Sequence, residues 1–369
     1  MTDTFTIGRR GLGAGLLGLA ALPRIGNAAD PVKFNLAMSS QTMTPAYPYL
    51  YVADQLGYWK EEGLDVNIVL TQGSGQVIQL LAAGQVQAGV INPEPVIVAR
   101  VKQKQTIRSI ASIGTIFSWA VGTLPDSPIQ NFADLKGKKL GVVSLASGGV
   151  LYVKARAEEA GLNPEKDFAT IAVGFGATAA QALQSRQVDA ILLWRGAFVG
   201  IENMGVKLRY VPPAPWEANL YSFIVASTDQ VIAQQGDAVA KMLRGLAKAS
   251  EFTMVNPKAA AQAYRQRYPD AINTRIDARV AFENDTRQIL GQLHDMGMDL
   301  ADVPKPPARI WGGQSERNWS FLQDYLKRTG QLDEAGDPSS YFTDQFTKAA
   351  NEFDRGPIDA AARNYKTEF

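Results

Sequence analysis

The chain has 369 residues, among them 37 lysines and arginines, 36 aspartates and glutamates, one histidine and no cysteine. With 46% hydrophobic and 20% charged residues, the composition is typical of a soluble globular protein, and a formal charge of +1 supplies no basic field for nucleic acid. The absence of cysteine excludes disulfides, thiolate nucleophiles, iron–sulfur clusters and cysteine-containing zinc sites. We therefore expect a protein that is not an enzyme and that holds neither a metal nor a cofactor. The single histidine, His294, is expected on the surface of a C-terminal helix.

Residues 1–29 are typical of an export signal. The pair Arg9-Arg10 precedes a weakly apolar run, residues 11–22, and small residues lead up to Ala29. A helix over this run covers about 18 Å, too short for a hydrocarbon core of roughly 30 Å. The paired arginines resemble a twin-arginine signal, with an ordinary secretory signal as the alternative. We expect cleavage near Ala28 or Ala29, release into the periplasm and no stable membrane anchor.

One pattern of strand, loop and helix occurs twice in the rest of the chain. In the first copy, a strand-like run at 33–38 leads to a polar loop and a helix-like segment at 49–62. In the second copy, a strand-like run at 138–143 leads to a helix-like segment at 150–160. A glycine follows both helical segments, as expected for a helix stop.

A second correspondence follows in each half. Residues 79–91 align without gaps on residues 181–193, and each segment follows a glycine-rich turn. Strand–helix–strand units of this spacing imply parallel strands joined by right-handed crossovers. We therefore predict an α/β fold of two similar lobes, with a coincidence of two generic units as the alternative.

Beyond residue 230 the pattern is helical, without intervening strands. Helices are expected over 231–255, 259–268, 277–293, 319–327 and 342–353, with a linker-like turn over 304–307. Such extra C-terminal helices are most simply a cover packed on one lobe.

Short segments along the chain carry a resemblance to a known family. They are GYWKEEGLDV at 57–66, the turn at 73–75 with QLLAAGQV at 79–86, NFADLKGK at 131–138, and an NP-x-x-A junction at 256–260. In this order, behind an export signal, they resemble the periplasmic substrate-binding proteins of ABC importers. The resemblance is to the type II class that takes up nitrate, sulfonates, taurine and thiamine precursors.

The resemblance implies two α/β lobes joined by two crossover strands, near 118–123 and 221–227, with the solute held between the lobes. The first lobe would comprise residues 30–118 and 226–369, and the second lobe residues 119–225. The implied partners are a small-molecule solute and an inner-membrane ABC permease. We expect a monomer without a nucleic-acid partner.

Ligands of open α/β sheets bind outside the carboxyl ends of the strands, and this rule selects the same loops in both halves. Ser74 and Ser147 lie at expected strand-to-helix turns, where free backbone N–H groups can receive an anionic or carbonyl oxygen. Each serine could instead only cap its own helix. Trp194 follows the strand expected at 190–193, where its ring can stack on a ligand; core packing is the alternative.

Further candidates have equally open alternatives. Glu94, between two prolines, could receive a ligand amine or point to solvent, and Arg195 could pair with a ligand anion or form a surface salt bridge. Trp119 and Tyr221 could contact the ligand or pack at the hinge. The candidate ligand-binding residues are Ser40, Gln41, Tyr49, Gly73, Ser74, Gly75, Gln76, Asn92, Glu94, Trp119, Ser147, Gly148, Gly149, Trp194, Arg195 and Tyr221.

The function expected from these features is that of a solute-binding receptor. It would capture a small anionic organic solute, such as a sulfonate or an aromatic carboxylate, by hinge closure of its lobes. One alternative is an exported sensory subunit of the same fold. The other is an enzyme like the pyrimidine-precursor synthases, which the resemblance makes less favoured because those relatives use cysteine-rich and histidine-containing segments.

Overall fold

The computed structural model describes residues 1–2, 30–297 and 310–369 of the chain. Contacts divide the chain into Met1–Asp30 and Pro31–Phe369, and all helices and strands given below belong to the second unit. The expected export signal, apart from its first two residues, and the expected turn at 304–307 lie outside the described residues. Within the described part, none of the helices has both the length and the apolarity needed to cross a membrane.

The first of two sheets has five strands in the order β2-β1-β3-β10-β4. Its strands are β1 (Val32–Met38), β2 (Leu64–Leu70), β3 (Ala88–Ile91), β4 (Ile107–Ser112) and β10 (Ile224–Thr228). Strands β1, β2 and β3 are parallel, and β10 runs antiparallel between β3 and β4. The helices that connect its early strands are α1 (Pro48–Gln55), α2 (Tyr58–Glu61), α3 (Ser74–Ala82) and α4 (Glu94–Val101). We call the part of the chain built on this sheet the first lobe.

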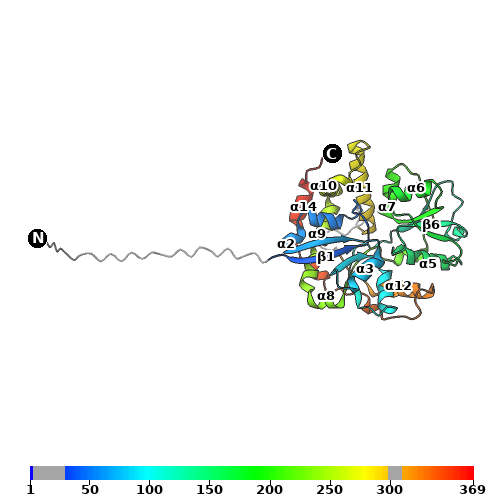
Figure 1. Ribbon diagram of the computed structural model, residues 1–369, viewed down its shortest axis with the longest axis horizontal. Coiled ribbons are helices and arrows are strands. Elements are labelled where there is room, and N and C mark those ends of the chain that lie inside the picture. Colours follow the sequence, from blue (N-terminus) through cyan, green and yellow to red (C-terminus); the bar gives the residue numbers. More distant parts are fainter. Residues whose placement is uncertain (3–29, 298–309) are drawn as a thin grey trace. The chain divides into compact units, whose positions relative to one another are not determined.

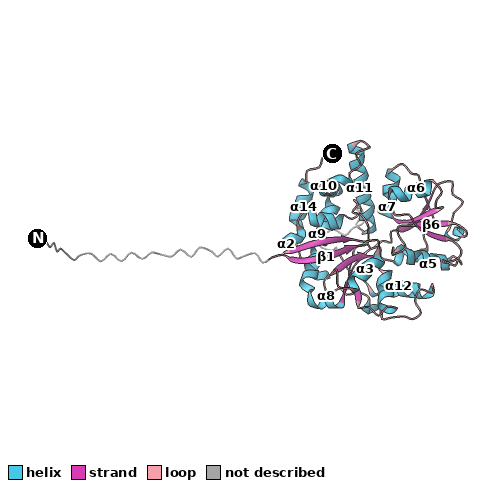
Figure 2. Ribbon diagram, in the orientation of Figure 1, coloured by secondary structure: helices cyan, strands magenta, loops and turns pink. Residues whose placement is uncertain are grey.

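The second sheet repeats this order as β7-β6-β8-β5-β9. Its strands are β5 (Trp119–Thr123), β6 (Lys139–Val142), β7 (Ala169–Ala172), β8 (Ala190–Trp194) and β9 (Arg209–Tyr210). Strand β6 is parallel to β7 and β8, whereas β5 is antiparallel to β8 and β9. The helical elements around it are the 3₁₀ turns η1 (Phe132–Leu135) and η2 (Pro215–Asn219) and the helices α5 (Gly149–Glu159), α6 (Ala177–Gln184) and α7 (Arg195–Asn203). This is the second lobe, and Figure 2 shows the strands gathered into the two sheets.

Local sequence explains the central elements of both lobes. Strands β3 and β8 have neighbours on both sides, and every residue of their apolar sequences AGVI and AILLW is buried. The helix expected at 49–62 is two helices, α1 and α2, because Gly57 between them adopts a left-handed φ of 75°. The predicted α/β fold of two lobes is confirmed.

The chain passes between the lobes twice, and the two passing segments lie side by side. The backbone N–H of Ile113 donates to the Phe223 carbonyl (2.8 Å), and that of Ser222 donates to the Gly114 carbonyl (3.0 Å). The hydroxyl oxygens of Ser118 and Ser222 are 2.5 Å apart. We call residues 113–118 and 220–223 the connecting segments.

The position expected for the crossover strands is therefore corrected by a few residues. Strand β5 pairs only within the second sheet, and β10 pairs only within the first. The chain has therefore already passed from one lobe to the other before β5 or β10 begins. Each sheet thus receives one antiparallel strand from the chain that has just left the other sheet.

The helices after β10 cover more than one lobe. They are α8 (Asp229–Gln234), α9 (Gly236–Val255), α10 (Pro257–Arg267), α11 (Ala278–Asp295), α12 (Glu316–Arg328), α13 (Thr347–Ala350) and α14 (Arg355–Asn364), with the 3₁₀ turns η3 (Pro269–Ala271) and η4 (Pro338–Ser340). Helices α9 and α10 pack on α1, whereas α11 packs on both α10 and α7 of the second lobe (Figure 1). The expectation of a cover on one lobe is wrong, because α11 contacts both.

The expectation of one helix over 342–353 is also wrong, because the structure has a helix only over the four residues of α13 in this range. The Tyr341 carbonyl accepts from the backbone N–H of Ser109 in β4 (2.8 Å), and the Thr343 N–H donates to the Ser109 carbonyl (2.9 Å). Since β4 is an edge strand of the first sheet, this segment satisfies its free edge instead of forming a helix.

Candidate functional site

The carboxyl ends of the parallel strands of both sheets meet around one small cavity, which we call the inner cavity. Its volume is about 10 Å³, room for one water molecule at most. The residues that line it are Ser39, Tyr47, Gly73, Ser74, Asn92, Trp119, Val143, Ser147, Gly148, Trp194 and Phe223. They include seven of the candidate residues, so the structure brings these seven together; their contact with a ligand stays a prediction.

Direct contacts between the lobes close the inner cavity. The backbone N–H of Gly75 in the first lobe donates to the Ala146 carbonyl in the second (3.1 Å). A Cβ at Gly148 would lie 2.4 Å from the Asn92 Oδ1 atom, and a Cβ at Gly196 would lie 2.8 Å from the Ala46 Cβ. The Asn92 amide in turn donates to the Ser222 carbonyl of a connecting segment (3.1 Å). The described conformation is therefore a closed one.

The two serines expected at helix starts differ in their contacts. The Ser74 hydroxyl accepts from the backbone N–H of Asn92 (3.2 Å), so it does not cap α3. The N-cap position of α5 is Gly148, and the Ser147 hydroxyl, one residue earlier, accepts from the Gly149 N–H in the first turn (3.3 Å), so Ser147 is not the helix cap either.

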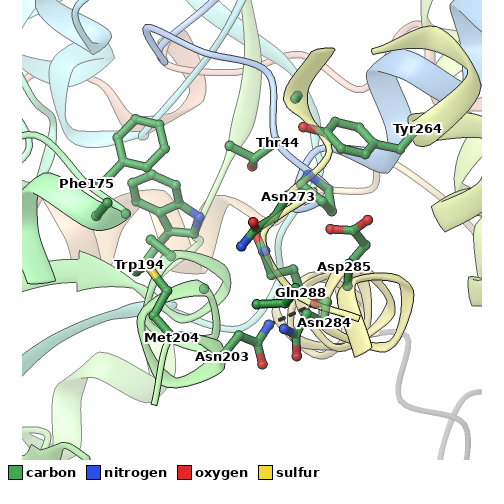
Figure 3. Close-up of a pocket in the computed structure, with 18 residues that line it drawn as sticks. Thr44, Phe175, Trp194, Asn203, Met204, Tyr264, Asn273, Asn284, Asp285 and Gln288 are labelled. Atoms are coloured by element: carbon green, nitrogen blue, oxygen red, sulfur yellow. Dashed lines mark hydrogen bonds between the residues drawn. The ribbon is translucent and has the colours of Figure 1, made fainter. Parts of the chain in front are cut away.

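A larger opening, the interlobe groove, adjoins the inner cavity and shares Trp194 with it (Figure 3). Its volume is about 510 Å³, within the usual range of small-molecule sites. The first lobe and the helices that cover it contribute Thr44, Pro45, Tyr264, Ala271, Asn273, Ile276, Ala281, Asn284, Asp285 and Gln288. The second lobe contributes Phe175, Gly176, Ala177, Trp194, Ala197, Gly200, Asn203 and Met204.

Trp194 is the centre of an aromatic cluster at this junction. Its ring stacks on Tyr47 of the first lobe at a centroid distance of 6.0 Å, and it also contacts Phe175 (5.2 Å) and Trp119 (6.1 Å). The side chain is 4% exposed, yet its indole Nε1 has no hydrogen-bond partner among the described residues. Figure 3 shows this nitrogen directed toward the opposite wall of the groove. The faces of the Trp194 ring are thus covered by other aromatic side chains, whereas the N–H group at its edge has no hydrogen-bond partner among the described residues.

The opposite wall is polar. Asn273, Asn284, Asp285 and Gln288 come from α11 and the segment before it, and the Asn203 amide donates to the Asn284 carbonyl across the groove (2.9 Å). Burial raises the pKa of Asp285 to about 6, although the nearby Arg265 guanidinium acts to lower it. This wall can both donate and accept hydrogen bonds.

Several candidate residues lie outside both the groove and the inner cavity. The Ser40 hydroxyl donates to the Thr42 carbonyl (2.9 Å), Gln41 is exposed, and the Gln76 side chain accepts from the Gln72 N–H (2.8 Å). Tyr49 is fully buried in the core of the first lobe.

The glycine candidates are explained by close approach. A Cβ at Gly149 would lie 2.6 Å from the Trp119 ring, so this glycine lets α5 pack on the tryptophan. Gly73 has a φ of 142°, and a Cβ there would lie 2.8 Å from the Ala146 carbonyl oxygen. Both glycines support contacts within or between the lobes.

The charged candidates are placed away from the groove. Glu94 is 2% exposed in the first turn of α4, and burial raises its pKa to about 8, so it neither points to solvent nor lines the groove. The Arg195 guanidinium donates to the Asp295 carboxylate of α11 (3.0 Å), so Arg195 forms a salt bridge, which was the alternative to pairing with a ligand anion. The Tyr221 hydroxyl accepts from the Ser315 N–H (2.8 Å) and its ring packs near Trp319, which matches hinge packing.

Sequence reasoning missed the polar wall entirely. Its residues follow α10, in the helical region that the sequence predicts to cover one lobe. No local sequence pattern indicates that Asn273 or Asp285 faces a groove. Phe175 carried one signal, its place in the turn Gly174-Phe175-Gly176 between β7 and α6.

Two five-stranded sheets with an exchanged antiparallel strand, and a groove between them, define the class of type II periplasmic binding proteins. The profile of the family described as NMT1/THI5-like matches residues 44–260, more than half of the chain. The chain belongs to the NMT1/THI5-like family. The class resemblance found in the sequence is thereby confirmed.

Two relatives are similar over most of their length. The chain is 24% identical over 330 residues to a 4-amino-5-hydroxymethyl-2-methylpyrimidine phosphate synthase of Aspergillus parasiticus, covering 82% of this chain and 84% of that protein. It is 26% identical over 307 residues to a formylaminopyrimidine-binding protein of Halalkalibacterium halodurans, covering 81% and 87%.

Two solved structures share the fold. The alkanesulfonate-binding protein SsuA of Xanthomonas axonopodis pv. citri, bound to MOPS, has a TM-score of 0.63 and 16% identity, covering 86% of this chain and all (100%) of that one. The periplasmic nitrate-binding protein NrtA of Synechocystis PCC 6803 has a TM-score of 0.61 and 13% identity, covering 91% and 99%. At these identities the likeness concerns the fold alone.

Proposed function

We propose that this protein is a periplasmic receptor that closes its lobes around one small organic solute and delivers it to an inner-membrane ABC importer. The observation that carries the proposal is the interlobe groove of about 510 Å³, with an aromatic wall from the second lobe and a polar wall from α11 and the segment before it. The binding proteins among the relatives and structural neighbours support a role in solute capture.

The two walls suit the energetics of closure. An aromatic ring of the solute that enters the groove would bury roughly 150–250 Å² of its own surface, worth about 4–6 kcal/mol before ordering costs. Micromolar affinity requires about 8 kcal/mol, so hydrogen bonds from the polar wall must supply the rest. The aromatic wall belongs to the second lobe, and the polar wall belongs to α11 and the segment before it, which also contact the helices that cover the first lobe. A solute that binds the closed form better than the open form shifts the equilibrium toward closure.

The anionic solute expected from the sequence has less support in this geometry than the solute-binding role itself. The expectation relied on the helix starts at Ser74 and Ser147 and on the Arg195 guanidinium. The two serines line a cavity of about 10 Å³, and Arg195 is paired with Asp295. The chemistry of the groove lining is the better guide to the solute.

The test is to identify what the protein binds and whether Trp194 holds it. Native mass spectrometry identifies any solute that co-purifies, and thermal shift measures its effect; a ligand at 100 times its Kd adds about 2.7 kcal/mol of stability. We expect the Trp194→Ala variant to lose this shift and to stay folded. The matched control is Trp216→Ala, because Trp216 also belongs to the second lobe but packs on Tyr325, away from the groove. An equal shift in both variants would place the ligand elsewhere.

An enzyme is the second candidate, because the Aspergillus relative is named a synthase and 84% of its length is matched. Incubation of the purified protein with its co-purifying solute distinguishes the two roles. If the protein is a receptor, mass spectrometry should find the solute unchanged in mass after the incubation. If it is an enzyme, mass spectrometry should find that the solute has been converted into a product of different mass.

A further inference from the structure

The interlobe groove has two chemically different walls (Figure 3). Phe175, Trp194 and Met204 form an apolar wall on the second lobe, and Asn273, Asp285 and Gln288 lie opposite. Among the described residues that line the groove, none is a lysine or arginine, and Asp285 is the one carboxylate. An anionic solute would find no opposite charge on these walls.

The apolar wall presents a buried donor. Trp194 is 4% exposed and its Nε1 has no hydrogen-bond partner within the described residues. In Figure 3 this nitrogen points across the groove toward the polar wall. Since an unpaired buried donor is unfavourable, the groove favours an occupant that offers a hydrogen-bond acceptor at this position.

The polar wall presents acceptors. The Asp285 Oδ2 atom lies 3.8 Å from the Nε of Arg265, which is beyond hydrogen-bond length, and Arg265 Nε and Nη1 have no hydrogen-bond partner in the described part of the chain. Asn203 Oδ1, across the groove on α7, is likewise buried without a partner among the described residues. Asp285 thus forms an ion pair with Arg265 that contains no hydrogen bond, and its oxygens retain lone pairs for an occupant.

From these contacts we infer that Asp285 determines solute specificity by accepting an N–H group of a flat solute that packs on Phe175 beside the edge of Trp194. The solute also carries an acceptor for the Trp194 N–H. Amides and amino-substituted nitrogen heterocycles meet both requirements, whereas carboxylates and sulfonates have no N–H group to donate to Asp285. The inference rests on the proposed function and names the solute class of the same groove.

The test uses four probes that share one ring: benzamide, benzamidine, benzoate and N,N-dimethylbenzamide. Thermal shift and titration calorimetry at up to about 10 mM report weak binding, in the millimolar range of about 4 kcal/mol. We expect benzamide to bind because it meets both requirements, and the benzamidinium cation to bind because it donates N–H groups to Asp285, although it has no acceptor for Trp194. Benzoate lacks the N–H group and carries the wrong charge, and dimethylbenzamide keeps the acceptor but has no N–H group, so both should bind at least about tenfold more weakly.

The variant Asp285→Asn keeps the shape of the side chain and removes the charge. It should weaken benzamidine binding by about tenfold or more and reduce the discrimination against benzoate. The matched control is Glu283→Gln, an exposed acid on the same helix that does not line the groove. Should Asp285→Asn not fold, the dimethylbenzamide comparison on the native protein still tests the N–H requirement.

Each of the following outcomes would contradict the inference or the proposed function. Benzoate binding as tightly as benzamide, equal binding of dimethylbenzamide, unchanged affinities in Asp285→Asn, or no binding of any probe overturns the inference. A co-purifying anion whose binding depends on Trp194 would overturn it while leaving the receptor function in place. Binding of benzamide that is unchanged in Trp194→Ala would instead remove the groove from both proposals.

Discussion

Gly148 of the second lobe has no room for a side chain, because Asn92 of the first lobe occupies that space: a Cβ at Gly148 would lie 2.4 Å from the Asn92 Oδ1 atom. Gly148 has a φ of −57°, a conformation open to any residue. Its requirement for glycine therefore comes from the contact between lobes. Because the contact joins the two lobes, opening of the lobes would break it.

Substitution of Gly148 by alanine is expected to prevent full closure. The added methyl group must displace Asn92, which is held by the Ser74 hydroxyl and the Ser222 carbonyl. X-ray scattering with saturating co-purified solute should show a larger radius of gyration than for the native protein, together with weaker binding. The control Gly313→Ala adds a methyl group where no atom lies within 4 Å, and its scattering should match the native protein. A fully compact Gly148→Ala complex would show that the described contact is not needed for closure.

A disulfide between positions 75 and 146 is expected to lock the lobes together. A Cβ at Gly75 would lie 3.7 Å from the Ala146 Cβ, close to the mean separation of about 3.8 Å in disulfides. Since the chain has no cysteine, the double variant Gly75→Cys/Ala146→Cys can form only this bridge within one molecule. Thiol titration should find no free thiol after oxidation, and the locked protein should exchange bound solute far more slowly until it is reduced.

The control for the bridge is Gly84→Cys/Ala146→Cys, because a Cβ at Gly84 meets no atom within 4 Å. Its thiols should stay free under the same oxidation. A locked protein that exchanges solute as fast as its reduced form would contradict entry through lobe opening.

The buried Glu94 is expected to make stability depend on pH. Burial raises its pKa from 4.5 to about 8, so between these values the folded state holds a proton that the unfolded state has released. The unfolded state then binds fewer protons, and the free energy of unfolding falls as pH rises from about 4.5 to about 8. The loss is about 5 kcal/mol.

Glu94→Gln should remove most of this dependence, since an amide stays neutral. Urea unfolding at pH 5 and pH 9 measures it: the two proteins should be similar at pH 5, and the variant more stable at pH 9. Glu283→Gln, at an exposed position, should keep the native pH profile. A native profile that is flat across this range would show that Glu94 is not held neutral.

The ion pair between Arg156 of α5 and Glu217 of η2 is expected to stabilise the second lobe. Both side chains are below one tenth exposed, at 9% and 8%, and Tyr152 also donates to Glu217 (2.7 Å). Glu217→Ala leaves the Arg156 charge buried without its partner and should cost about 3–5 kcal/mol in urea unfolding. Asp126→Ala breaks the Arg186–Asp126 pair, which is 51% and 70% exposed, and should change stability by less than about 1 kcal/mol. Equal losses in both variants would contradict this difference.

Much of the fold was predictable because it depends on residues close together in the chain. The strand runs at 33–38 and 138–143 and the glycine stops at Gly63 and Gly161 lie where the structure has β1, β6 and two helix ends. The position of Trp194 at the end of β8 followed from the same strand pattern. Apolar periodicity and helix termination act over a few residues, so the sequence displays them directly.

The candidate site was predictable at the strand ends and not beyond them. Six of the seven candidates around the inner cavity lie at or just after the carboxyl ends of parallel strands of the two sheets, whereas Trp119 begins the antiparallel strand β5. Arg195 and Glu94 follow strands by the same rule, but Arg195 pairs with a residue 100 positions away and Glu94 enters the interior with α4. Such partners depend on which distant segments pack together.

The sequence by itself determined the two repeated α/β units, their helix ends and the aromatic residue that ends β8. Only the tertiary structure decided that β5 and β10 each join a sheet beside strands from distant parts of the chain, and that α11 reaches α7 and lines the groove with Asp285. The physical reason is that local conformation is set by neighbours a few positions apart. The choice of packing partner instead depends on burying whole faces of helices and sheets against segments that no short pattern identifies.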